Sequence, residues 1–496
     1  MRVFSSVLSG TARADDTSAT VASCSSTESS VPLCVDLDGT LVTSDTLLES
    51  LLTLARQDPW ALLYLPIWML GGRASFKQRV AERVTPAAFR LPFRSDLIEH
   101  LEQQRRAGRT LILVTAANES TARCVAAYLG LFDRVMASDA QRNLKGAGKA
   151  AALVAEFGER GFDYAGDSRA DLDVWSSARR ALVVGSPAFA ERVAALAPVE
   201  KVFERSAASL TDWANALRVY QWVKNLLLFV PLIAAHKAND VELVLHGLVA
   251  FLAFSLCASS VYLINDLFDL DADRAHPWKS SRAFAAGRLS ISSGIAAVPI
   301  LLVPAFAIAA RLPFAFMAIL ALYFAAALLY SLRLKRSAVL DVLVLAGLYT
   351  LRLLAGAAAV SVPASFWLLA FSMFLFLSLA LVKRVGELGN LPADGSAAGR
   401  GYRRDDLPVL LALGTASGYT AVMVFALYIN SSTSELLYRH PRALWLLCPL
   451  LLFWVSRVWL VTHRGEMHDD PIVFAFRDPV SLWLVVPAAA ILWLAI

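Results

Sequence analysis

The sequence predicts two unlike domains: an N-terminal α/β domain built on a parallel sheet, then an all-α domain that spans a membrane about nine times. Composition carries the first part of this prediction. Of the 496 residues, 57% are hydrophobic and only 18% are charged, which is too apolar for a soluble protein of this size. The apolar residues are also unevenly spread. Residues 1–215 have an ordinary soluble composition, whereas Leu, Ala, Val, Phe and Trp dominate residues 220–496.

Composition and motifs together place the expected boundaries. Residues 1–30 are rich in Ser, Thr and Ala and lack the apolar core of a signal peptide, so we expect a disordered segment there. The α/β domain is expected over residues 31–200, a linker over 201–217 and the membrane domain over 218–496. The five cysteines form no CxxC pair, which fits a reducing compartment without a disulfide framework or a zinc site.

Four short apolar runs predict the strands of the α/β domain. They cover residues 31–36, 110–115, 162–166 and 181–185, and helical segments at about 118–130 and 147–158 separate them. Strands that alternate with helices form a parallel, doubly wound sheet of Rossmann-like type, with its site at the carboxyl ends of the strands. Polar side chains follow three of these strands: Asp36 and Asp38, then Thr115, then Asp167 with Asp171.

This ordered set of motifs resembles the haloacid dehalogenase-like hydrolases. The resemblance implies that Asp36 is the phosphoryl-accepting nucleophile and that Asp38 protonates the leaving oxygen and later activates water. A carboxylate attacks phosphorus well only when a metal and a lysine remove the charge repulsion. Thr115 and either Lys145 or Lys149 would bind the phosphoryl oxygens. Mg²⁺ would be held by Asp167, with Asp171 in support, together with Asp36 and Asp38. The alternative is a degraded fold that is retained for regulation.

Residues 45–95 would form a helical cap over this site. Their apolar run, Pro59 to Leu70, is too short to cross a bilayer. It therefore forms either the core of the cap or a patch that lies on the membrane.

Hydropathy predicts nine spans in the second domain. They lie at roughly 220–235, 243–264, 291–310, 313–332, 339–360, 364–382, 407–429, 443–462 and 479–496. The first is short, so neighbouring helices would have to shelter it. Lys and Arg gather in the loops on the side of residue 265, which predicts that these loops and the N-terminal domain are cytoplasmic and the C-terminus outside. The net charge of +5 is mostly this topological signal and gives no indication of nucleic-acid binding.

Three oxygen ligands follow the second span at helical spacing. Asn265, Asp269 and Asp273 lie four residues apart, which places them on one face of a helix. Three basic side chains come directly afterwards: His276, Lys279 and Arg282. Mg²⁺ takes carboxylate and amide oxygens, and cations bind the remaining phosphate charge, so the stretch predicts a Mg²⁺-diphosphate site at the membrane surface.

The same residues resemble the first Asp-rich motif, NxxxDxxxD, of the UbiA superfamily of intramembrane transferases, whose fold has nine helices. The basic residues after it, and Gln221-Trp-Val-Lys224-Asn225 before the first long span, resemble the polyprenyl-phosphate phosphoribosyltransferase branch. Tyr330, Lys335 and Asp341 resemble the second UbiA motif, in which lysine and aspartate meet the diphosphate and its metal. Here Leu345 stands where a second carboxylate is usual, which disfavours a prenyl diphosphate donor.

Further cations complete the candidate substrate site: Lys224, Arg352, Lys383 and Arg384. Arg352 falls inside a span, where a charge needs a polar partner, and either substrate phosphate or a structural Asp would provide one. Lys383 and Arg384 either bind phosphate or anchor the helix by the positive-inside rule.

The resemblance implies that a polyprenyl phosphate attacks C1 of phosphoribosyl diphosphate and that pyrophosphate leaves with Mg²⁺. The fused hydrolase domain would then remove the 5-phosphate from the product. The first alternative is transfer of a prenyl chain from its diphosphate to an aromatic acceptor such as 4-hydroxybenzoate. The second is a lipid-binding or regulatory membrane protein whose motifs are relics. The expected partners are the bilayer, an isoprenoid lipid and a diphosphate substrate, while the sequence leaves the oligomeric state open.

Overall fold

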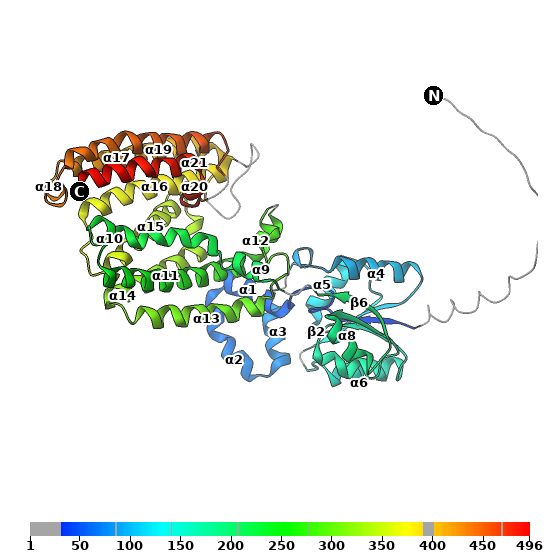
Figure 1. Cartoon of the computed structure of the whole chain (residues 1–496). Helices are drawn as coiled ribbons and strands as arrows, with labels where there is room; N and C mark the ends of the chain where they lie inside the picture. The colour runs from blue at the N-terminus through cyan, green and yellow to red at the C-terminus, as the bar shows by residue number, and fades with distance from the viewer. Residues whose placement is uncertain are drawn as a thin grey trace, which may run out of the picture. The chain divides into compact units, whose positions relative to one another are not determined.

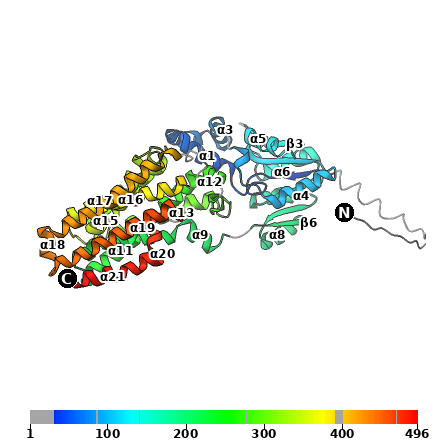
Figure 2. The same cartoon turned by 90° about the horizontal axis from the view of Figure 1, so that it is seen from above.

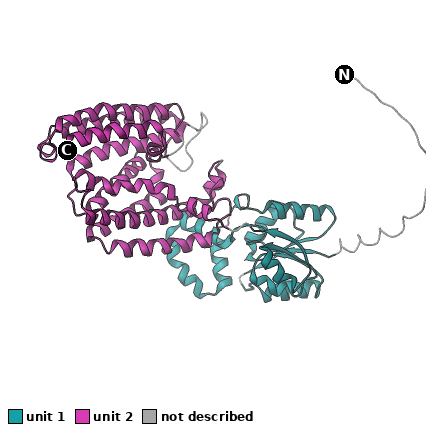
Figure 3. Cartoon of the chain, in the orientation of Figure 1, with its two compact units in different colours: residues 1–207 teal, residues 208–496 magenta. Residues whose placement is uncertain are grey.

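The computed structural model describes residues 31–84, 87–139, 141–205, 208–276, 278–389, 401–467 and 470–496. The expected disordered segment, residues 1–30, lies outside these ranges. The chain forms two compact units, residues 1–207 and 208–496, which Figure 3 distinguishes by colour. Each unit is described here by itself.

The first unit is built on the predicted parallel sheet, of which Figure 1 labels β2 and β6. The sheet has six strands in the order β3-β2-β1-β4-β5-β6. The strands are β1 (Leu33–Val35), β2 (Leu111–Asn118), β3 (Arg134–Ser138), β4 (Asp163–Gly166), β5 (Ala181–Gly185) and β6 (Val199–Glu204). The two edge strands, β3 and β6, add to the four that the apolar runs predict. The strand order reverses between β1 and β4, and this reversal opens a crevice at their carboxyl ends.

Helices cover both faces of the sheet, which explains the continuous apolar strands. Within β1, Leu33 and Val35 join a core with α4 (Ser95–Arg106) and α5 (Glu119–Leu129). Cys34 points into a second core with α6 (Ala147–Phe157), α7 (Leu172–Trp175) and α8 (Pro187–Ala194).

The range expected as a linker, residues 201–217, contains parts of two regular elements. Residues 201–204 belong to β6, where Phe203 is buried against the His100 ring. Residues 210–216 form α9 (Leu210–Ala216), which a capping box of Ser209 and Asp212 begins. The sequence did not predict β6 because the charged residues of this edge strand obscure the alternation of apolar and polar side chains.

The predicted cap follows β1 and comprises α1 (Thr46–Gln57), η1 (Pro59–Tyr64), α2 (Leu65–Leu70) and α3 (Arg73–Arg83). It has a small core of its own, formed by Leu54, Ala61, Trp68, Val80 and Val84. The apolar run at 59–70 therefore contributes Ala61 and Trp68 to this core and leaves most of its other large side chains exposed.

The second unit is helical, and seven helices among the described residues are long and apolar enough to cross a membrane. A bent pair, α20 (Pro471–Arg477) and α21 (Pro479–Ala495), makes eight if it is one span, and its two helices meet at 77°. The expected nine is not reached. The seven are α11 (Val241–Phe268), α13 (Ile291–Ala309), α14 (Phe314–Leu332), α15 (Leu340–Ala359), α16 (Phe366–Gly389), and the segments Arg404–Ile429 and Pro441–His463, which contain α17 (Leu407–Ile429) and α19 (Leu447–His463).

The expected first span is the element that falls short. It forms a 3-10 helix, η4 (Val219–Phe229), continued by α10 (Val230–Ala234). This segment runs antiparallel along α11, as its successive contacts demonstrate: Arg218 with Asp266, Trp222 with Ser259, Asn225 with Ser255 and Phe229 with Gly247. The expected shelter by a neighbouring helix is thus present. The other long helices pack mainly on their sequence neighbours (Figure 2).

Candidate functional site

The first candidate site lies in the crevice between β1 and β4. Asp36 follows β1, while Asp167 and Asp171 follow β4, and one carboxylate oxygen of each lies within 4.8 Å of the others. Gly39, at φ +78°, allows this approach, because a Cβ there would lie 2.1 Å from Oδ2 of Asp167. The hydroxyl of Thr40 donates to Asp167 at 3.3 Å. Hard oxygen donors in this arrangement suit Mg²⁺.

One buried cation serves this cluster. Nζ of Lys149 lies 3.0 Å from Asp36 and 3.3 Å from Asp171, and it donates to the Tyr164 hydroxyl at 2.8 Å. Lys145, the other lysine that the sequence left open, is exposed. Lys149 therefore occupies the place beside the nucleophile that the resemblance assigns to a lysine.

The carboxyl groups of this cluster are buried with too little positive charge nearby, and burial shifts their pKa values. It raises the pKa of Asp36 to about 6 and the pKa of Asp167 to about 7, although Lys149 opposes the shift at Asp36. Burial acts in the same direction at Asp171, yet Lys149 holds the pKa of Asp171 below its usual range. A bound divalent cation would restore the charged form of Asp36 and Asp167, so these residues fit the metal.

Asp38 and Thr115 lie beside the cluster rather than in it. Asp38 accepts from the backbone N–H of Thr46, the first residue of the cap helix α1, at 2.8 Å. Burial and the neighbouring Asp45 raise the pKa of Asp38 to about 7, which suits proton transfer near neutral pH. Thr115 is fully buried, and its Oγ1 accepts from the backbone of Ala117 at 3.0 Å.

The cap contributes two side chains that sequence reasoning missed. Lys77 of α3 donates to the carbonyl of Ala116 at 2.6 Å, directly after Thr115, and Gln78 accepts from Asn118 at 2.6 Å. Burial lowers the pKa of Lys77, while the charge of Asp38 acts against that shift. Arg205, also missed, lies 3.8 Å from Asp167. No short motif marks these residues, because only the packing of the cap and of β6 brings them to the crevice.

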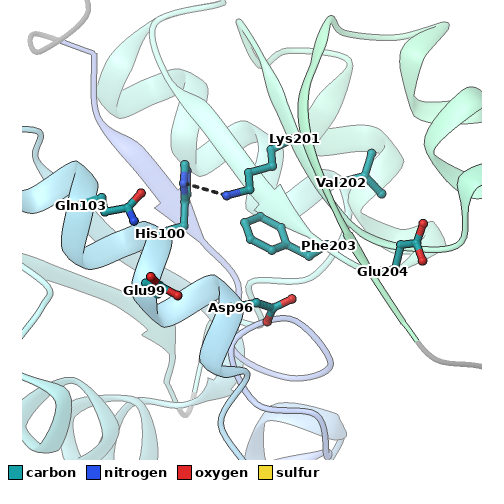
Figure 4. A pocket seen from close by; sticks show the side chains of 8 residues that line it. All are labelled: Asp96, Glu99, His100, Gln103, Lys201, Val202, Phe203 and Glu204. Carbon is teal, nitrogen blue, oxygen red and sulfur yellow. Dashed lines mark hydrogen bonds between the residues drawn. The ribbon is translucent and has the colours of Figure 1, made fainter.

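A separate cavity of about 330 Å³ lies between α4 and β6 (Figure 4). Its walls include Asp96, Glu99 and Glu204, and Lys201 contacts His100 there at 3.4 Å. It includes none of the motif residues, so we do not place phosphoryl chemistry in it.

In the second unit, the first Asp-rich motif keeps its helical spacing across a break. Helix α11 ends at Phe268 and α12 (Leu270–Ala275) follows. The backbone N–H of Asp269 still donates to Asn265 at 2.9 Å, and that of Asp273 to Asp269 at 2.8 Å. These bonds preserve the four-residue repeat of the backbone across the break.

Each carboxylate of this motif is paired with a cation. Nζ of Lys335 lies 2.6 and 2.7 Å from the two oxygens of Asp269, and Arg282 lies 2.7 Å from Asp273. Asp266, which the sequence did not single out, pairs with Arg218 at 2.5 Å and with Arg282 at 3.2 Å. The structure thus joins two predicted site residues, Lys335 and Arg282, to the motif. Lys279 and His276 are half-buried nearby in the chain, without an ion pair to any described residue.

The polar side chains of the second motif are paired with other side chains of the same unit. Asp341 is fully buried, 2.7 Å from Nε of Arg384, and it accepts from the Tyr402 hydroxyl at 2.6 Å. Arg384 also contacts Glu387 and the Tyr330 hydroxyl, the latter at 3.3 Å. Arg384 and Tyr330 therefore serve the pairing of Asp341 in this structure.

The remaining predicted cations divide into two groups. Arg352 donates to Asn225 at 3.0 Å and to Tyr323 at 3.1 Å, and it stacks against Phe254 and Tyr349. This polar and aromatic cage provides the partners of the Arg352 guanidinium, in place of the substrate phosphate or structural Asp that the sequence suggested.

Lys224 and Lys383 instead meet Asp470, at 2.7 and 3.5 Å, and Tyr349 donates to the same carboxylate at 3.1 Å. Burial acts to raise the pKa of Asp470, but the two lysines hold that pKa below its usual range. Sequence analysis did not single out Asp470, because its partners Lys224 and Lys383 lie far away in the chain.

Each of the two units matches a known protein family. The UbiA prenyltransferase family profile matches residues 226–493, and the haloacid dehalogenase-like hydrolase profile matches residues 33–175. The chain is 40% identical to the uncharacterized protein y4nM of Sinorhizobium fredii over 463 residues, which cover 92% of this chain and 89% of that one. A match of this length includes both units.

Two further relatives match about half of the chain. Nodulation protein NoeC of Azorhizobium caulinodans is 35% identical over 54% of this chain and 88% of its own. Decaprenyl-phosphate phosphoribosyltransferase of Mycolicibacterium smegmatis is 31% identical over 54% of this chain and 86% of its own. Among solved structures, a UbiA homolog from Archaeoglobus fulgidus bound to DMAPP and Mg²⁺ aligns at a TM-score of 0.44 and 18% identity, over 56% of this chain and 98% of that one.

Proposed function

The chain belongs to the UbiA prenyltransferase family and is an integral membrane protein with an N-terminal haloacid dehalogenase-like hydrolase domain, and from this premise we propose its reaction. The membrane domain transfers the phosphoribosyl group of phosphoribosyl diphosphate to a polyprenyl phosphate. The products are polyprenyl-phosphoryl phosphoribose and pyrophosphate. The relative named decaprenyl-phosphate phosphoribosyltransferase, 86% of which aligns with this chain, supports the proposal.

The single structural observation that carries the choice of donor is the state of the second motif. Asp341 is committed to Arg384 and Tyr402, and Leu345 occupies the next helical turn. The second motif therefore offers no pair of carboxylates at the spacing that a second metal-bound diphosphate group would use. The first motif, with Asn265, Asp269 and Asp273, would hold Mg²⁺ by itself.

The basic side chains have a direct role in this proposal. Lys335 and Arg282 neutralise Asp269 and Asp273 while the site lacks substrate. Asp269 and Asp273 would hold the Mg²⁺ that accompanies a diphosphate, and the metal would supply stabilisation of the charge on the leaving pyrophosphate. The two cations are then released to bind phosphate oxygens. Lys224 and Lys383 are held at Asp470 and would accept the phosphate of the lipid in the same way.

The hydrolase domain carries out the next step in our proposal. Asp36 attacks the phosphorus of the 5-phosphate, and the ribose O5 leaves with a proton from Asp38. Asp38 then takes a proton from water, which attacks the aspartyl phosphate and releases inorganic phosphate. Lys149, 3.0 Å from Asp36, reduces the repulsion between the attacking carboxylate and the phosphate. The fusion recurs in a relative that matches both units, which fits two consecutive steps.

We also propose that the hydrolase domain and the motif loops lie on the cytoplasmic side of the plasma membrane and that the C-terminus lies outside. Arg218, which ends the tether to the hydrolase domain, pairs with Asp266 at the motif end of α11. The carbonyl of Ala495 accepts from the backbone of His440, in the loop at the other end of α17 and α19. Cysteine labelling from each side of sealed vesicles tests this arrangement. Equal access to residues 279 and 440 would contradict it.

The test of function is Mg²⁺-dependent transfer in membranes. One reaction supplies labelled phosphoribosyl diphosphate with polyprenyl phosphate, and the other supplies prenyl diphosphate with 4-hydroxybenzoate. We expect labelled lipid only in the first, absent with Asp269→Ala and retaining its 5-phosphate with Asp36→Ala. Product only in the second reaction would replace our proposal with ordinary prenyl transfer. Product in neither would favour a lipid-binding protein with relic motifs.

A further inference from the structure

The tip of the cap exposes an unusually apolar surface. In η1 and α2, between Pro59 and Leu70, the side chains of Trp60, Leu63 and Leu70 are 74%, 68% and 87% exposed. Tyr64, Ile67 and Met69 are also exposed on the same short segment. Contiguous apolar surface of this kind on a folded domain marks an interaction site. We call this segment, residues 59–70, the cap tip.

The exposed side chains of the cap tip are not needed for the core of the cap. Ala61 and Trp68 already face that core, together with Leu54, Val80 and Val84. The outward residues combine two aromatic side chains with long aliphatic ones, a composition typical of segments at a membrane interface. Twelve residues are too few to cross the hydrocarbon core, so the segment is suited to lie in the interface.

Basic residues surround the cap tip. Residues 56–83 contain five, Arg56, Arg73, Lys77, Arg79 and Arg83, against two acidic ones, Asp58 and Glu82. Arg56, Arg73, Arg79 and Arg83 are exposed, and Arg83 lies over the ring of Trp68 at 4.5 Å. An apolar surface with a cationic border complements a bilayer that carries anionic headgroups.

The chain keeps this surface close to a bilayer. Strand β6 ends at Glu204, and the first apolar segment of the membrane domain begins at Val219. The 14 residues between them, 205–218, span at most about 50 Å when fully extended. Part of this stretch is the helix α9, which shortens the tether further. The cap tip therefore meets a lipid surface at high effective concentration.

We propose that the cap tip inserts into the interfacial layer of the bilayer, with its basic border on anionic headgroups. Helix α3 begins beside the cap tip and carries Lys77, which contacts Ala116 directly after Thr115. Insertion thereby presents the phosphatase crevice to phosphate groups at headgroup level, and its substrates are lipid-linked phosphomonoesters. The substrate class rests on the proposed hydrolase function, whereas the insertion does not.

Depth-dependent quenching in the full chain tests the insertion. The protein is reconstituted in vesicles with anionic lipid, with Cys24 and Cys124 replaced by serine and a fluorophore attached at Leu63→Cys. A label at Glu191→Cys, on the exposed side of α8, is the matched control. We expect lipids with a nitroxide near the headgroup to quench the label at 63 and aqueous iodide to quench only the label at 191. Iodide quenching of both, or protection of residue 63 from both quenchers, would overturn the proposal; the latter result would mean that protein covers the cap tip.

A triple variant, Trp60→Ser, Leu63→Ser and Leu70→Ser, tests the consequence for substrate choice. Hydrolysis of a water-soluble phosphomonoester is expected to stay unchanged, because these side chains lie outside the crevice and the cap core. Hydrolysis of polyprenyl-phosphoryl phosphoribose in vesicles is expected to fall at least tenfold. An equal loss on both substrates, or none on the lipid, would contradict the role of the cap tip. If the wild type inserts but leaves the lipid phosphorylated, the hydrolase function fails and the insertion stands.

Discussion

The two candidate sites of this chain neutralise their carboxylates in opposite ways. In the hydrolase domain Asp36 and Asp171 share the buried cation Lys149, and within the described part of the chain the ion pair of Asp167 is the longer one to Arg205. In the membrane domain Asp269, Asp273 and Asp470 each have a close lysine or arginine. The first site holds excess negative charge, and the second is nearly balanced.

The difference in charge balance predicts a difference in how the two sites would take up the proposed Mg²⁺. The excess charge of the hydrolase cluster raises the pKa of Asp36 and Asp167, so the cluster stores an unfavourable state that a divalent cation relieves. At a membrane surface unpaired carboxylates cost more, which fits the close lysine or arginine at each of Asp269, Asp273 and Asp470. We therefore expect metal to bind the hydrolase site without substrate and the membrane site only with the diphosphate.

The largest effect is expected from the nucleophile. Asp36→Asn keeps the shape of the side chain and removes its ability to attack phosphorus. Release of inorganic phosphate should fall at least about a thousandfold, as loss of a nucleophile does in other enzymes. Phosphoribosyl transfer should remain. Asp173→Asn, at an exposed position in the same domain, is the matched control. Residual phosphatase activity above a few per cent would remove Asp36 from this role.

The next largest effect is expected at Lys335. Its substitution tests whether Lys335 leaves its ion pair with Asp269 to bind substrate phosphate. Lys335→Ala should lower kcat/KM for transfer about a hundredfold, because a charge-assisted contact to phosphate contributes about 3 kcal/mol. Thermal stability should change little, because Lys335 and Asp269 are only partly buried. Arg336→Ala, at the exposed next position, should leave transfer intact. Normal transfer by Lys335→Ala would make the pair with Asp269 purely structural.

Patterns among residues that are close in sequence predicted the features that local strand and helix geometry determines. The polar residues after β1 and β4, and Thr115 within β2, could be found because parallel strands end at one edge of a sheet. Asn265, Asp269 and Asp273 could be found because a helix repeats every 3.6 residues. The partners that decide the state of each site could not, since Asp470 with Lys224 and Asp341 with Tyr402 are far apart in sequence.

The segment at the place of the expected first span, residues 219–234, illustrates the same limit: it is short in number of residues rather than in length. A hydropathy window counts residues and assumes the rise of an α-helix, which makes residues 219–234 about 24 Å long. Most of this segment is the 3-10 helix η4, whose rise of about 2 Å per residue brings the whole to roughly 30 Å. Composition alone does not reveal that difference in rise.

A smaller effect is expected from Lys77, which adds positive charge to the unbalanced site from the cap. Lys77→Met should raise KM for a soluble phosphomonoester about tenfold, since a hydrogen bond to a charged group contributes about 1.5 kcal/mol. The value of kcat should change much less, because Lys149 remains beside Asp36. Arg79→Met, on the same helix and exposed, is the control. A fall in kcat at constant KM would instead place Lys77 in the chemical step.

The smallest effect is a pH-dependent stabilisation by Mg²⁺. Asp36, Asp38 and Asp167 have pKa values of about 6, 7 and 7 in the folded, metal-free domain, above the value near 4 of an unfolded chain. Between those values the folded state binds more protons, so its stability falls as pH rises from about 4 to 7. Mg²⁺ should therefore raise the Tm of the hydrolase domain in the full-length protein by several degrees at pH 8 and hardly at all at pH 5. Asp167→Asn should reduce this difference, because it removes one of the groups that the cation must compensate. A Mg²⁺ effect of equal size at both pH values would mean that the cluster is not short of positive charge, and the contrast between the two sites would fail.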